Sequence, residues 1–285
     1  MTCRIILVGA PGLTLRATAG LLWPDSSVVR AHHHTGWSAI AFSYSHRFEG
    51  DLALVRQRAE QAGVDVVEVT GPLAGRPPGL VVSDVDSTIT RTEGIDLLAE
   101  QAGRAREVAE VTDRAMAGEL DFTESLRARV ACLSGLPVAA VAEASEAVVL
   151  TDGAPEFVDQ AHRAGAEVAL VSGGFTAMVE PLAEHLGVDH VAANTLEVED
   201  GHLTGRLTGP VVDRAAKAEW LRRWAARLDL PTDLTVAVGD GANDIDMLTA
   251  AGLGVSLCGR PAARAAADAA ISRPHVDAVS AVWTV

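Results

Sequence analysis

Several residue types are scarce in this chain of 285 residues, and each scarcity excludes a class of protein. The three cysteines, Cys3, Cys132 and Cys258, are too few and too scattered for a disulfide framework or a zinc site. Lys and Arg together number 23 against 38 Asp and Glu, so the formal net charge is −15. That balance argues against binding to nucleic acid or to an anionic membrane surface. No apolar run approaches the ~20 residues of a membrane helix. We therefore expect a cytoplasmic protein.

The chain does contain an apolar strand pattern, residues 80–83, that runs directly into two carboxylates. Asp84 and Asp86 are two residues apart, so in an extended backbone their side chains point to the same side. Open α/β sheets bind their ligands at this end of their strands. Two like charges at this spacing repel unless a cation lies between them or one keeps a proton. The pair therefore indicates either a Mg²⁺ site or a nucleophile beside a general acid.

A second acidic cluster follows another apolar strand pattern far downstream, at residues 235–239. Asp240 lies between two glycines that let the backbone approach a ligand closely, and Asn243 and Asp244 follow at the start of a predicted helix. Two acidic strand ends together offer the hard oxygen ligands that Mg²⁺ prefers.

Polar groups suited to an anion lie between these two clusters. The strand pattern at residues 168–172 ends in Ser172, Gly173 and Gly174, where a hydroxyl and free backbone N–H groups at a helix start would bind phosphate. Lys217 is the only lysine in the sequence, and its compact ammonium suits a developing phosphoryl charge.

Taken in order, these four motifs resemble those of the haloacid dehalogenase-like phosphotransferase superfamily, over about residues 79–285. Within it, the segment between the first two motifs resembles the phosphoserine phosphatases. The residues that carry this closer resemblance are Glu93, Met116 and Phe122 within 114–122, and Arg129 within 125–130.

The resemblance implies a two-step phosphate-ester hydrolysis. Asp84 would attack phosphorus to form an aspartyl-phosphate, and Asp86 would protonate the leaving oxygen and then activate water. Mg²⁺ would be bound by the side chains of Asp84 and Asp240 and by the backbone carbonyl of Asp86. The remaining assignments place Ser172 and Lys217 on phosphate oxygens, Asn243 in the same pocket, and Asp244 as the acid that orients Lys217 or a metal-bound water.

The resemblance also implies that the substrate is O-phospho-L-serine, as in the last step of serine biosynthesis. Glu93 would pair with its ammonium and Arg129 with its carboxylate. Met116 and Phe122 would shape the pocket, and Gly173 and Gly174 would add backbone contacts. Without the four motifs, the same cap residues are more typical of a helix-terminal acid, a solvated arginine and core side chains, and the motifs reverse that preference.

The order of elements predicts an α/β fold of Rossmann type. Strands expected at 80–83, 168–172, 188–192, 235–239 and 254–257 alternate with helices expected at 154–163, 177–186, 214–228 and 244–251, which indicates a parallel sheet. Residues 93–150 show helical patterns only and are expected to form a cap over the site. A β-hairpin is expected at 196–208, around Asp200 and Gly201. A further helix is expected at 260–270.

The first 71 residues predict a small ferredoxin-like domain with the order βαββαβ. We expect strands at 4–10, 27–34, 37–45 and 64–69 and helices at 13–22 and 52–63, with a linker at 72–78 and the phosphatase core at 79–285. This part resembles an ACT regulatory domain without the acidic residue common before its first helix, and such domains often pair as homodimers. In the strand at 27–34, only His32 and His34 share a face.

Two other functions compete with this prediction. One is a related phosphatase or phosphotransferase acting on another small phosphomonoester such as phosphohomoserine, and only the four cap residues separate it from the first. The other is a non-catalytic regulatory protein, which has no need of the complete set of Asp84, Asp86, Lys217 and Asp240.

Overall fold

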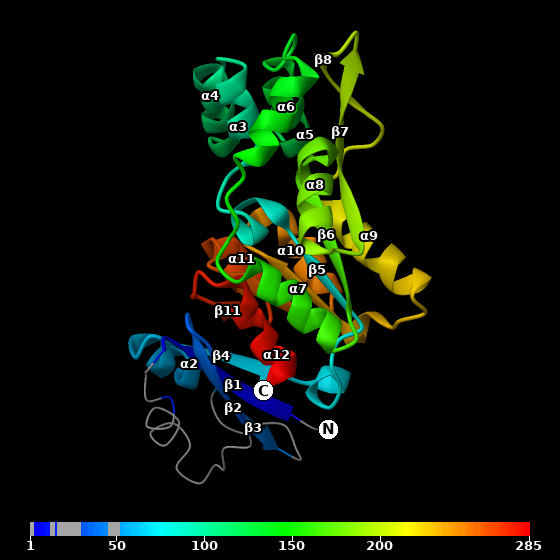
Figure 1. Cartoon of the computed structure of the whole chain (residues 1–285). Coiled ribbons are helices and arrows are strands. Elements are labelled where there is room, and N and C mark those ends of the chain that lie inside the picture. The colour runs from blue at the N-terminus through cyan, green and yellow to red at the C-terminus, as the bar shows by residue number, and fades with distance from the viewer. Residues whose placement is uncertain (1–2, 12–14, 16–29, 45–51) are drawn as a thin grey trace.

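The computed structural model describes residues 3–11, 15, 30–44 and 52–285, and within them it contains two sheets. A seven-stranded sheet forms the middle of the molecule, a helical cap lies at one end, and a four-stranded sheet lies at the other (Figure 1). None of the helices in these residues is long and apolar enough to cross a membrane.

The large sheet has the order β11-β10-β9-β5-β6-β7-β8 and is parallel except for the pair β7 and β8. Its strands are β5 (Leu80–Ser83), β6 (Glu167–Phe175), β7 (His190–Glu199), β8 (His202–Thr208), β9 (Thr235–Gly239), β10 (Leu253–Leu257) and β11 (Ala269–Ile271). The chain runs outward from β5 in both directions, so β5 lies at the topological switch point where such sheets bind ligands. The predicted Rossmann-like parallel sheet is therefore confirmed.

Helices cover both faces of this sheet. One face packs against α7 (Ala154–Arg163), α8 (Thr176–Leu186), the short helix η5 (Val276–Ser280) and α12 (Ala281–Thr284), and the other against α9 (Arg214–Arg227), α10 (Ile245–Ala250) and α11 (Pro261–Ala266). Further short turns are η2 (Val85–Ile89), η3 (Thr232–Leu234) and η4 (Ala242–Asp244). The central strands are buried along their whole length because apolar side chains point to both faces.

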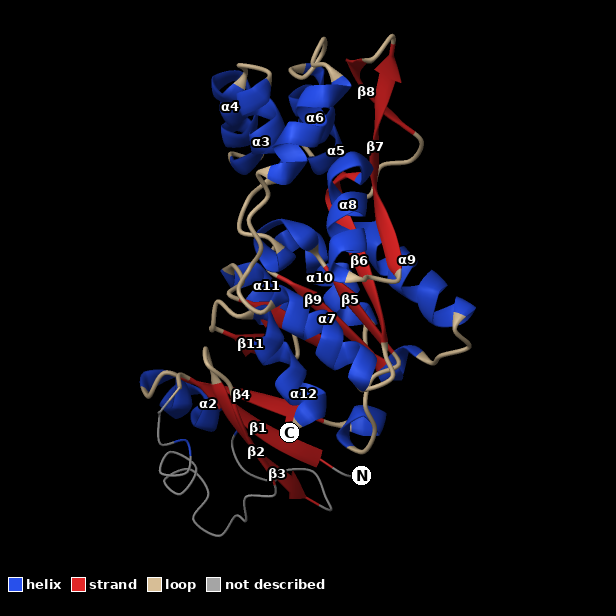
Figure 2. Cartoon of the chain, in the orientation of Figure 1, coloured by secondary structure: helices blue, strands red, loops and turns tan. Residues whose placement is uncertain are grey.

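Residues 94–146 form four helices with a core of their own. They are α3 (Gly94–Gln101), α4 (Ala105–Met116), α5 (Phe122–Ala131) and α6 (Val138–Glu146). Their buried face packs against Phe175 and Met178 and against Leu196 and Leu203 of the hairpin formed by β7 and β8. Figure 2 shows this hairpin beside the cap helices. Asp200 and Gly201 form the turn of this hairpin. Their φ angles, +48° and +77°, are left-handed, as the predicted tight turn requires.

The small sheet has the order β2-β3-β1-β4 with every neighbouring pair antiparallel, as in a ferredoxin-like domain. Its elements are β1 (Cys3–Gly9), β2 (Arg30–His33), β3 (Ser38–Tyr44), α2 (Leu52–Gln61) and β4 (Val64–Val69), with η1 (Gly71–Ala74) after them. The helix expected at 13–22 and the first residues of the strand expected at 27–34 lie outside the described residues. The ACT resemblance and the domain boundaries stay predictions.

The small sheet is docked on the large one through an apolar face. Ile6, Val8 and Trp37 belong to the same buried cluster as Val276 and Trp283. The indole of Trp37 donates a hydrogen bond of 2.7 Å to the buried carboxylate of Asp277, and His32 and His34 both stack on the Trp37 ring. The shared face expected for these two histidines is therefore used for packing.

One expected helix is partly wrong. The helix expected at 260–270 ends at Ala266, and Ala269–Ile271 form the edge strand β11, where Ala269 pairs with Val255. Alanine favours helices in isolation, but pairing with β10 buries these residues at the sheet edge and outweighs that preference.

Candidate active site

Asp84 occupies the central position of the site. Its backbone N–H continues the ladder from β5 to Val238 at 2.9 Å, and its side chain accepts a hydrogen bond of 2.7 Å from Val85 N. The residue is only 3% exposed. In the turn that follows, Ser87 adopts a left-handed φ of +58°, a strained conformation for a non-glycine residue, of a kind that clusters at functional sites.

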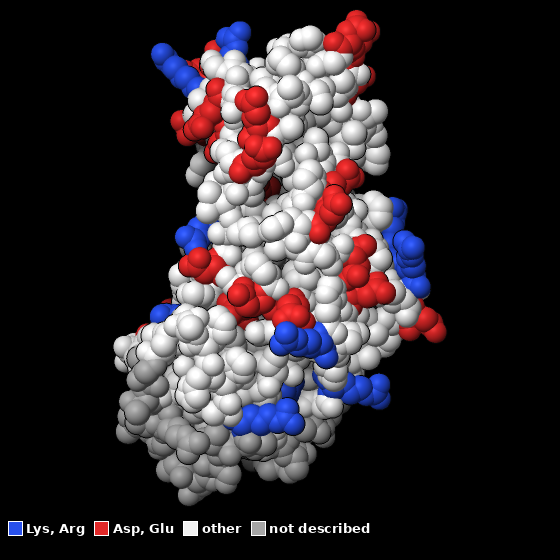
Figure 3. All heavy atoms as spheres, viewed as in Figure 1, with Lys and Arg blue, Asp and Glu red and all other residues white. Residues whose placement is uncertain are grey.

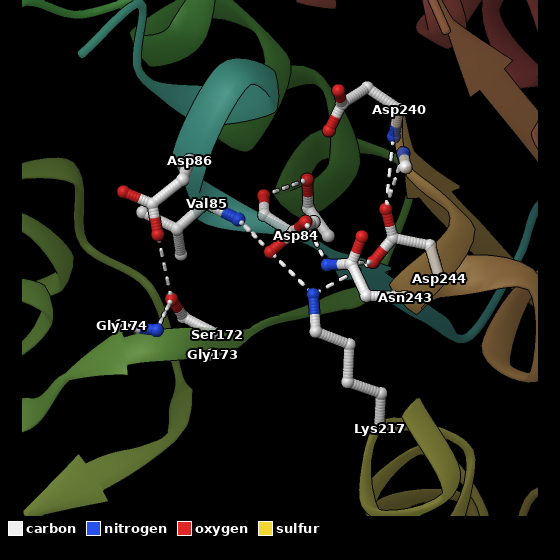
Figure 4. Close-up of polar contacts among 12 residues, drawn as sticks. Asp84, Val85, Asp86, Ser172, Gly173, Gly174, Lys217, Asp240, Asn243 and Asp244 are labelled. Carbon is white, nitrogen blue, oxygen red and sulfur yellow. Dashed lines mark hydrogen bonds and ion pairs between the residues drawn. The ribbon is translucent and has the colours of Figure 1, made fainter. Parts of the chain in front are cut away.

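A buried ammonium bridges two carboxylates below this loop. Lys217 Nζ, from α9, lies 2.7 Å from Asp84 Oδ1 and 2.7 Å from Asp244 Oδ1, and Lys217 and Asp244 are fully buried (Figure 4). Burial and the charge of Asp244 raise the pKa of Asp84 well above its usual value, although Lys217 opposes this shift. Burial alone would lower the pKa of Lys217, but the charges of Asp84 and Asp244 outweigh it and raise the pKa.

Asp240 adds a third carboxylate beside Asp84 and Asp244, whereas Lys217 supplies a single positive charge. One carboxylate oxygen each from Asp84, Asp240 and Asp244 lie within 4.8 Å of one another. Asp244 Oδ2 also accepts the N–H groups of Asp240 at 3.1 Å and Gly241 at 2.9 Å, which fixes the loop. Burial and Asp244 raise the pKa of Asp240. Three acidic groups around one ammonium, all with hard oxygen donors, fit a bound divalent cation.

Asp86 points away from this cluster. Its Oδ1 accepts the N–H of Gly94 at 2.9 Å and its Oδ2 accepts the hydroxyl of Ser172 at 3.2 Å, as Figure 4 shows for Ser172. Ser172 in turn accepts the N–H of Gly174 at 2.7 Å. A Cβ at Gly174 would lie 3.0 Å from Asp86 Oδ2, so the close approach requires glycine there. The carboxylate of Asp86 thus makes its hydrogen bonds outside the acidic cluster of Asp84, Asp240 and Asp244.

Asn243 lies beside Asp84 and Asp244. Its side-chain N–H₂ group lies 3.4 Å from Asp84 Oδ2, on the side of Asp84 away from Ser172. The structure therefore brings together the residues predicted from the four motifs. Their catalytic roles stay proposals.

Two of the predicted cap residues lie at the mouth of the site. Glu93 accepts a hydrogen bond of 2.8 Å from Ser87, and partial burial followed by the charge of Asp86 raises its pKa. Arg129 donates to the backbone oxygen of Ser125 at 3.4 Å. Burial lowers the pKa of Arg129. The negative charges of Glu93, Asp96 and Asp86 act in the opposite direction, and Glu93 has the largest effect of the three. Glu93, Arg129 and Asp86 therefore share one electrostatic environment.

The two apolar cap residues differ from each other. Phe122 packs on Gly173: a Cβ added to Gly173 would lie 3.0 Å from the Phe122 ring. Phe122 therefore reaches the Ser172–Gly174 loop. Met116 is 71% exposed at the end of α4, so most of its side chain faces solvent. Its expected place in the pocket stays a prediction.

Asn194 is a residue that the sequence patterns did not single out. It is 2% exposed in β7, its Nδ2 donates to the backbone oxygen of Gly173 at 2.8 Å, and its Oδ1 accepts the N–H of Val212 at 2.8 Å. It therefore ties the Ser172–Gly174 loop to the segment that leads into α9 and Lys217. The signal available in the sequence was weak: an asparagine directly after the short apolar run 191–193.

Comparison with known proteins agrees with this geometry. The sequence model of the haloacid dehalogenase-like hydrolases matches residues 81–249. The chain belongs to this family. Among curated members of the family, it is 52% identical to the phosphoserine phosphatase of Streptomyces coelicolor over 221 residues, which cover 78% of this chain and 54% of that protein. The chain thus spans about half the length of that relative.

A shorter curated protein and a solved structure that are similar to this chain are also named as phosphoserine phosphatases. The phosphoserine phosphatase of Streptococcus thermophilus is 48% identical over 198 residues, covering 70% of this chain and 92% of that one. The crystal structure of a probable phosphoserine phosphatase from Vibrio cholerae, unliganded, matches with a TM-score of 0.83 and 34% identity, over 98% of this chain and 85% of that one. This family member therefore shares its fold with that enzyme beyond the phosphatase core, through the small sheet.

Proposed function

We propose that this chain is a phosphoserine phosphatase that hydrolyses O-phospho-L-serine to L-serine and phosphate. The observation that carries the proposal is the placement of Asp84 in the acidic cluster and against Lys217, with Asp86 held apart by Ser172 and Gly94. The curated relatives named phosphoserine phosphatase support the same activity.

In this proposal Asp84 is the nucleophile. Its Oδ attacks phosphorus, the phosphorus–oxygen bond to the seryl oxygen breaks, and an aspartyl-phosphate forms. Asp86 gives a proton to the leaving oxygen and then accepts one from the water that hydrolyses the intermediate. Ser172 and Lys217 hold phosphate oxygens, and Asp244 keeps Lys217 in place through their 2.7 Å contact.

The acidic cluster fits Mg²⁺ as the cofactor. Asp84 and Asp240 would hold it with the backbone oxygen of Asp86, and Asp244 lies close enough to take part. When bound, Mg²⁺ supplies positive charge that reduces repulsion between the anionic nucleophile and the anionic phosphate. A cytoplasmic location and a homodimer remain further parts of the proposal, the first supported by the low cysteine count and the second by analogy with ACT domains.

The test is phosphate release from O-phospho-L-serine, O-phospho-L-threonine, phosphohomoserine and an aryl phosphate, each with Mg²⁺ and with EDTA. We expect a strong preference for phosphoserine and activity at background level in EDTA. Preference for another compound would be consistent with the proposed mechanism but would show that phosphoserine is not the substrate. Full activity in EDTA would reject the metal.

Substrate recognition gives a separate prediction. Glu93→Gln should raise KM for phosphoserine by about tenfold or more, because a charge-assisted hydrogen bond to the ammonium is lost. In the unmodified protein KM should rise as the pH falls through the raised pKa of Glu93, since protonated Glu93 no longer attracts the ammonium.

The matched control is 3-phosphoglycerate, which has a hydroxyl in place of the ammonium. Its turnover, however slow, should show the same KM in both proteins. An equal loss on both substrates would mean that Glu93 only supports the fold of the loop through Ser87. Arg129→Lys should likewise raise KM, because lysine does not reproduce the two-pronged contact with a carboxylate.

A further inference from the structure

A cavity of about 260 Å³ lies far from the active site, where the small sheet meets the core. Its walls come from three parts of the chain: β1 to β3, residues 74–77, and the end of α12. Figure 3 shows Arg side chains where the small sheet meets the core, with Asp and Glu side chains beside some of them. The cavity is open to solvent, so a small molecule has access to it.

Three guanidinium groups line this cavity, those of Arg4, Arg30 and Arg76, and no Asp or Glu does. Three positive charges grouped in one cavity are unexpected in a chain with a net charge of −15. Like charges held together repel, and burial followed by the charge of Arg30 lowers the pKa of Arg4.

The backbone satisfies only part of this positive charge. Arg4 Nη1 donates to the main-chain oxygen of Val285 at 2.9 Å, and its Nη2 donates to those of Leu73 at 2.8 Å and Val282 at 2.6 Å. Its Nε is buried without a partner. The side chains of Arg30 and Arg76 are exposed and make no hydrogen bond or ion pair with any residue that the structure describes. Within the described residues, both guanidinium groups are therefore available to a ligand.

Most of the remaining side chains in the wall are apolar. Ala41, Ala74, Pro77, Val285 and the indole of Trp283 line it, with Ser43 as the one hydroxyl. The volume lies just below the usual range for drug-sized ligands, so the occupant is a small molecule. Paired guanidinium groups suit two carboxylates or one phosphate, because each arginine can form a bidentate contact with an oxyanion.

We propose that this cavity is a binding site for a small organic dianion, held by Arg30 and Arg76 and packed against Trp283. Such a ligand contacts the small sheet, the segment that joins it to the core, and the last helix at once. The proposal does not depend on the phosphatase activity, because none of these residues touches the active site.

The test is calorimetric titration of the full chain with succinate and with glycerol 3-phosphate, with glycerol as the neutral control and at constant ionic strength. We expect saturable binding of at least one dianion, one per chain, and none of glycerol. The double variant Arg30→Gln/Arg76→Gln should weaken binding at least about tenfold, because two charge-assisted contacts are removed.

Two further variants locate the bound molecule. Arg222→Gln/Arg227→Gln makes the same change in charge at exposed positions of α9, and Ser172→Ala weakens the phosphate loop of the active site. Both should bind the dianion as the unmodified chain does. Binding that is lost in Ser172→Ala but kept in the Arg30/Arg76 variant would place the ligand in the active site and overturn the proposal. Equal weakening in both arginine pairs, or binding of neither dianion, would overturn it as well.

Discussion

Replacing Asp84 by Asn is expected to reduce kcat by at least about 10³-fold while the folded chain keeps its stability or gains some. The amide cannot attack phosphorus to form an acyl phosphate, so the first chemical step is lost. Asparagine has nearly the same shape and can still accept the hydrogen bond from Val85 N.

The stability of this variant follows from the raised pKa of Asp84. Burial and Asp244 disfavour its charged form in the folded chain. A carboxyl whose pKa is raised by folding stabilises the fold below its unfolded pKa, and this contribution is lost as the pH rises through the folded pKa. Asparagine carries no such charge. Without divalent metal, Asp84→Asn should therefore unfold at the same or a higher temperature than the unmodified chain near pH 7, and the gain should shrink as the pH falls.

Kinetics and thermal unfolding check this prediction together, with Asp113→Asn on the exposed face of α4 as the matched control. The control should change neither quantity. Appreciable turnover by Asp84→Asn would remove Asp84 as nucleophile, and a large fall in its unfolding temperature would show that the carboxylate supports the fold.

The chemistry of the site was predictable from the sequence because it lies at strand ends. Strand, turn and acid occur within a few neighbouring residues at Asp84 and at Asp240, and a parallel sheet brings such ends to one edge. The two clusters are joined across β5 and β9, which pair in parallel as strands of the predicted parallel sheet, although the patterns did not predict that these two would be neighbours. The patterns predicted a small ferredoxin-like domain, and the structure adds its strand order.

Features that depend on contacts between distant segments could not be predicted. Asn194 is important for the site only because Gly173 and Val212 lie on either side of it. The side chain of Met116 is directed by how α4 packs, and composition says nothing about that direction. The docking of Trp37 on Asp277 joins residues 240 positions apart in the sequence. The strand β11 forms because β10 offers an edge, which outweighs the helical preference of its alanines.

Replacing Lys217 by Ala should cost both stability and activity. The ammonium is fully buried and contacts Asp84 and Asp244 at 2.7 Å each. Its removal leaves two buried carboxylates beside one another without a counter-charge, and loss of one partner of a buried ion pair costs about 3–5 kcal/mol. Phosphate binding should weaken too, because the cation nearest the nucleophile is gone.

The pH dependence of this loss identifies its cause. Lys217 opposes the upward shift of the Asp84 pKa, so without Lys217 that pKa rises further and folding favours the protonated form of Asp84. The destabilisation should therefore be small at low pH and should grow as the pH rises through the raised pKa of Asp84. Added Mg²⁺ should restore part of the stability at neutral pH, because a divalent cation replaces the missing charge between the carboxylates. A pH-independent loss, with no effect of Mg²⁺, would instead indicate a cavity left by the missing side chain.

Two further variants test whether the loss of stability comes from the contact between Lys217 and Asp84. Arg214→Ala removes a cation one turn earlier on α9, where its partner Asp246 is on the surface, and should change the unfolding free energy by no more than about 1 kcal/mol. In the Asp84→Asn background, Lys217→Ala should cost clearly less than in the unmodified chain, because only Asp244 is then left unpaired. Equal costs in the two backgrounds would mean that Lys217 and Asp84 do not interact, and the placement of the ammonium on the nucleophile would be wrong.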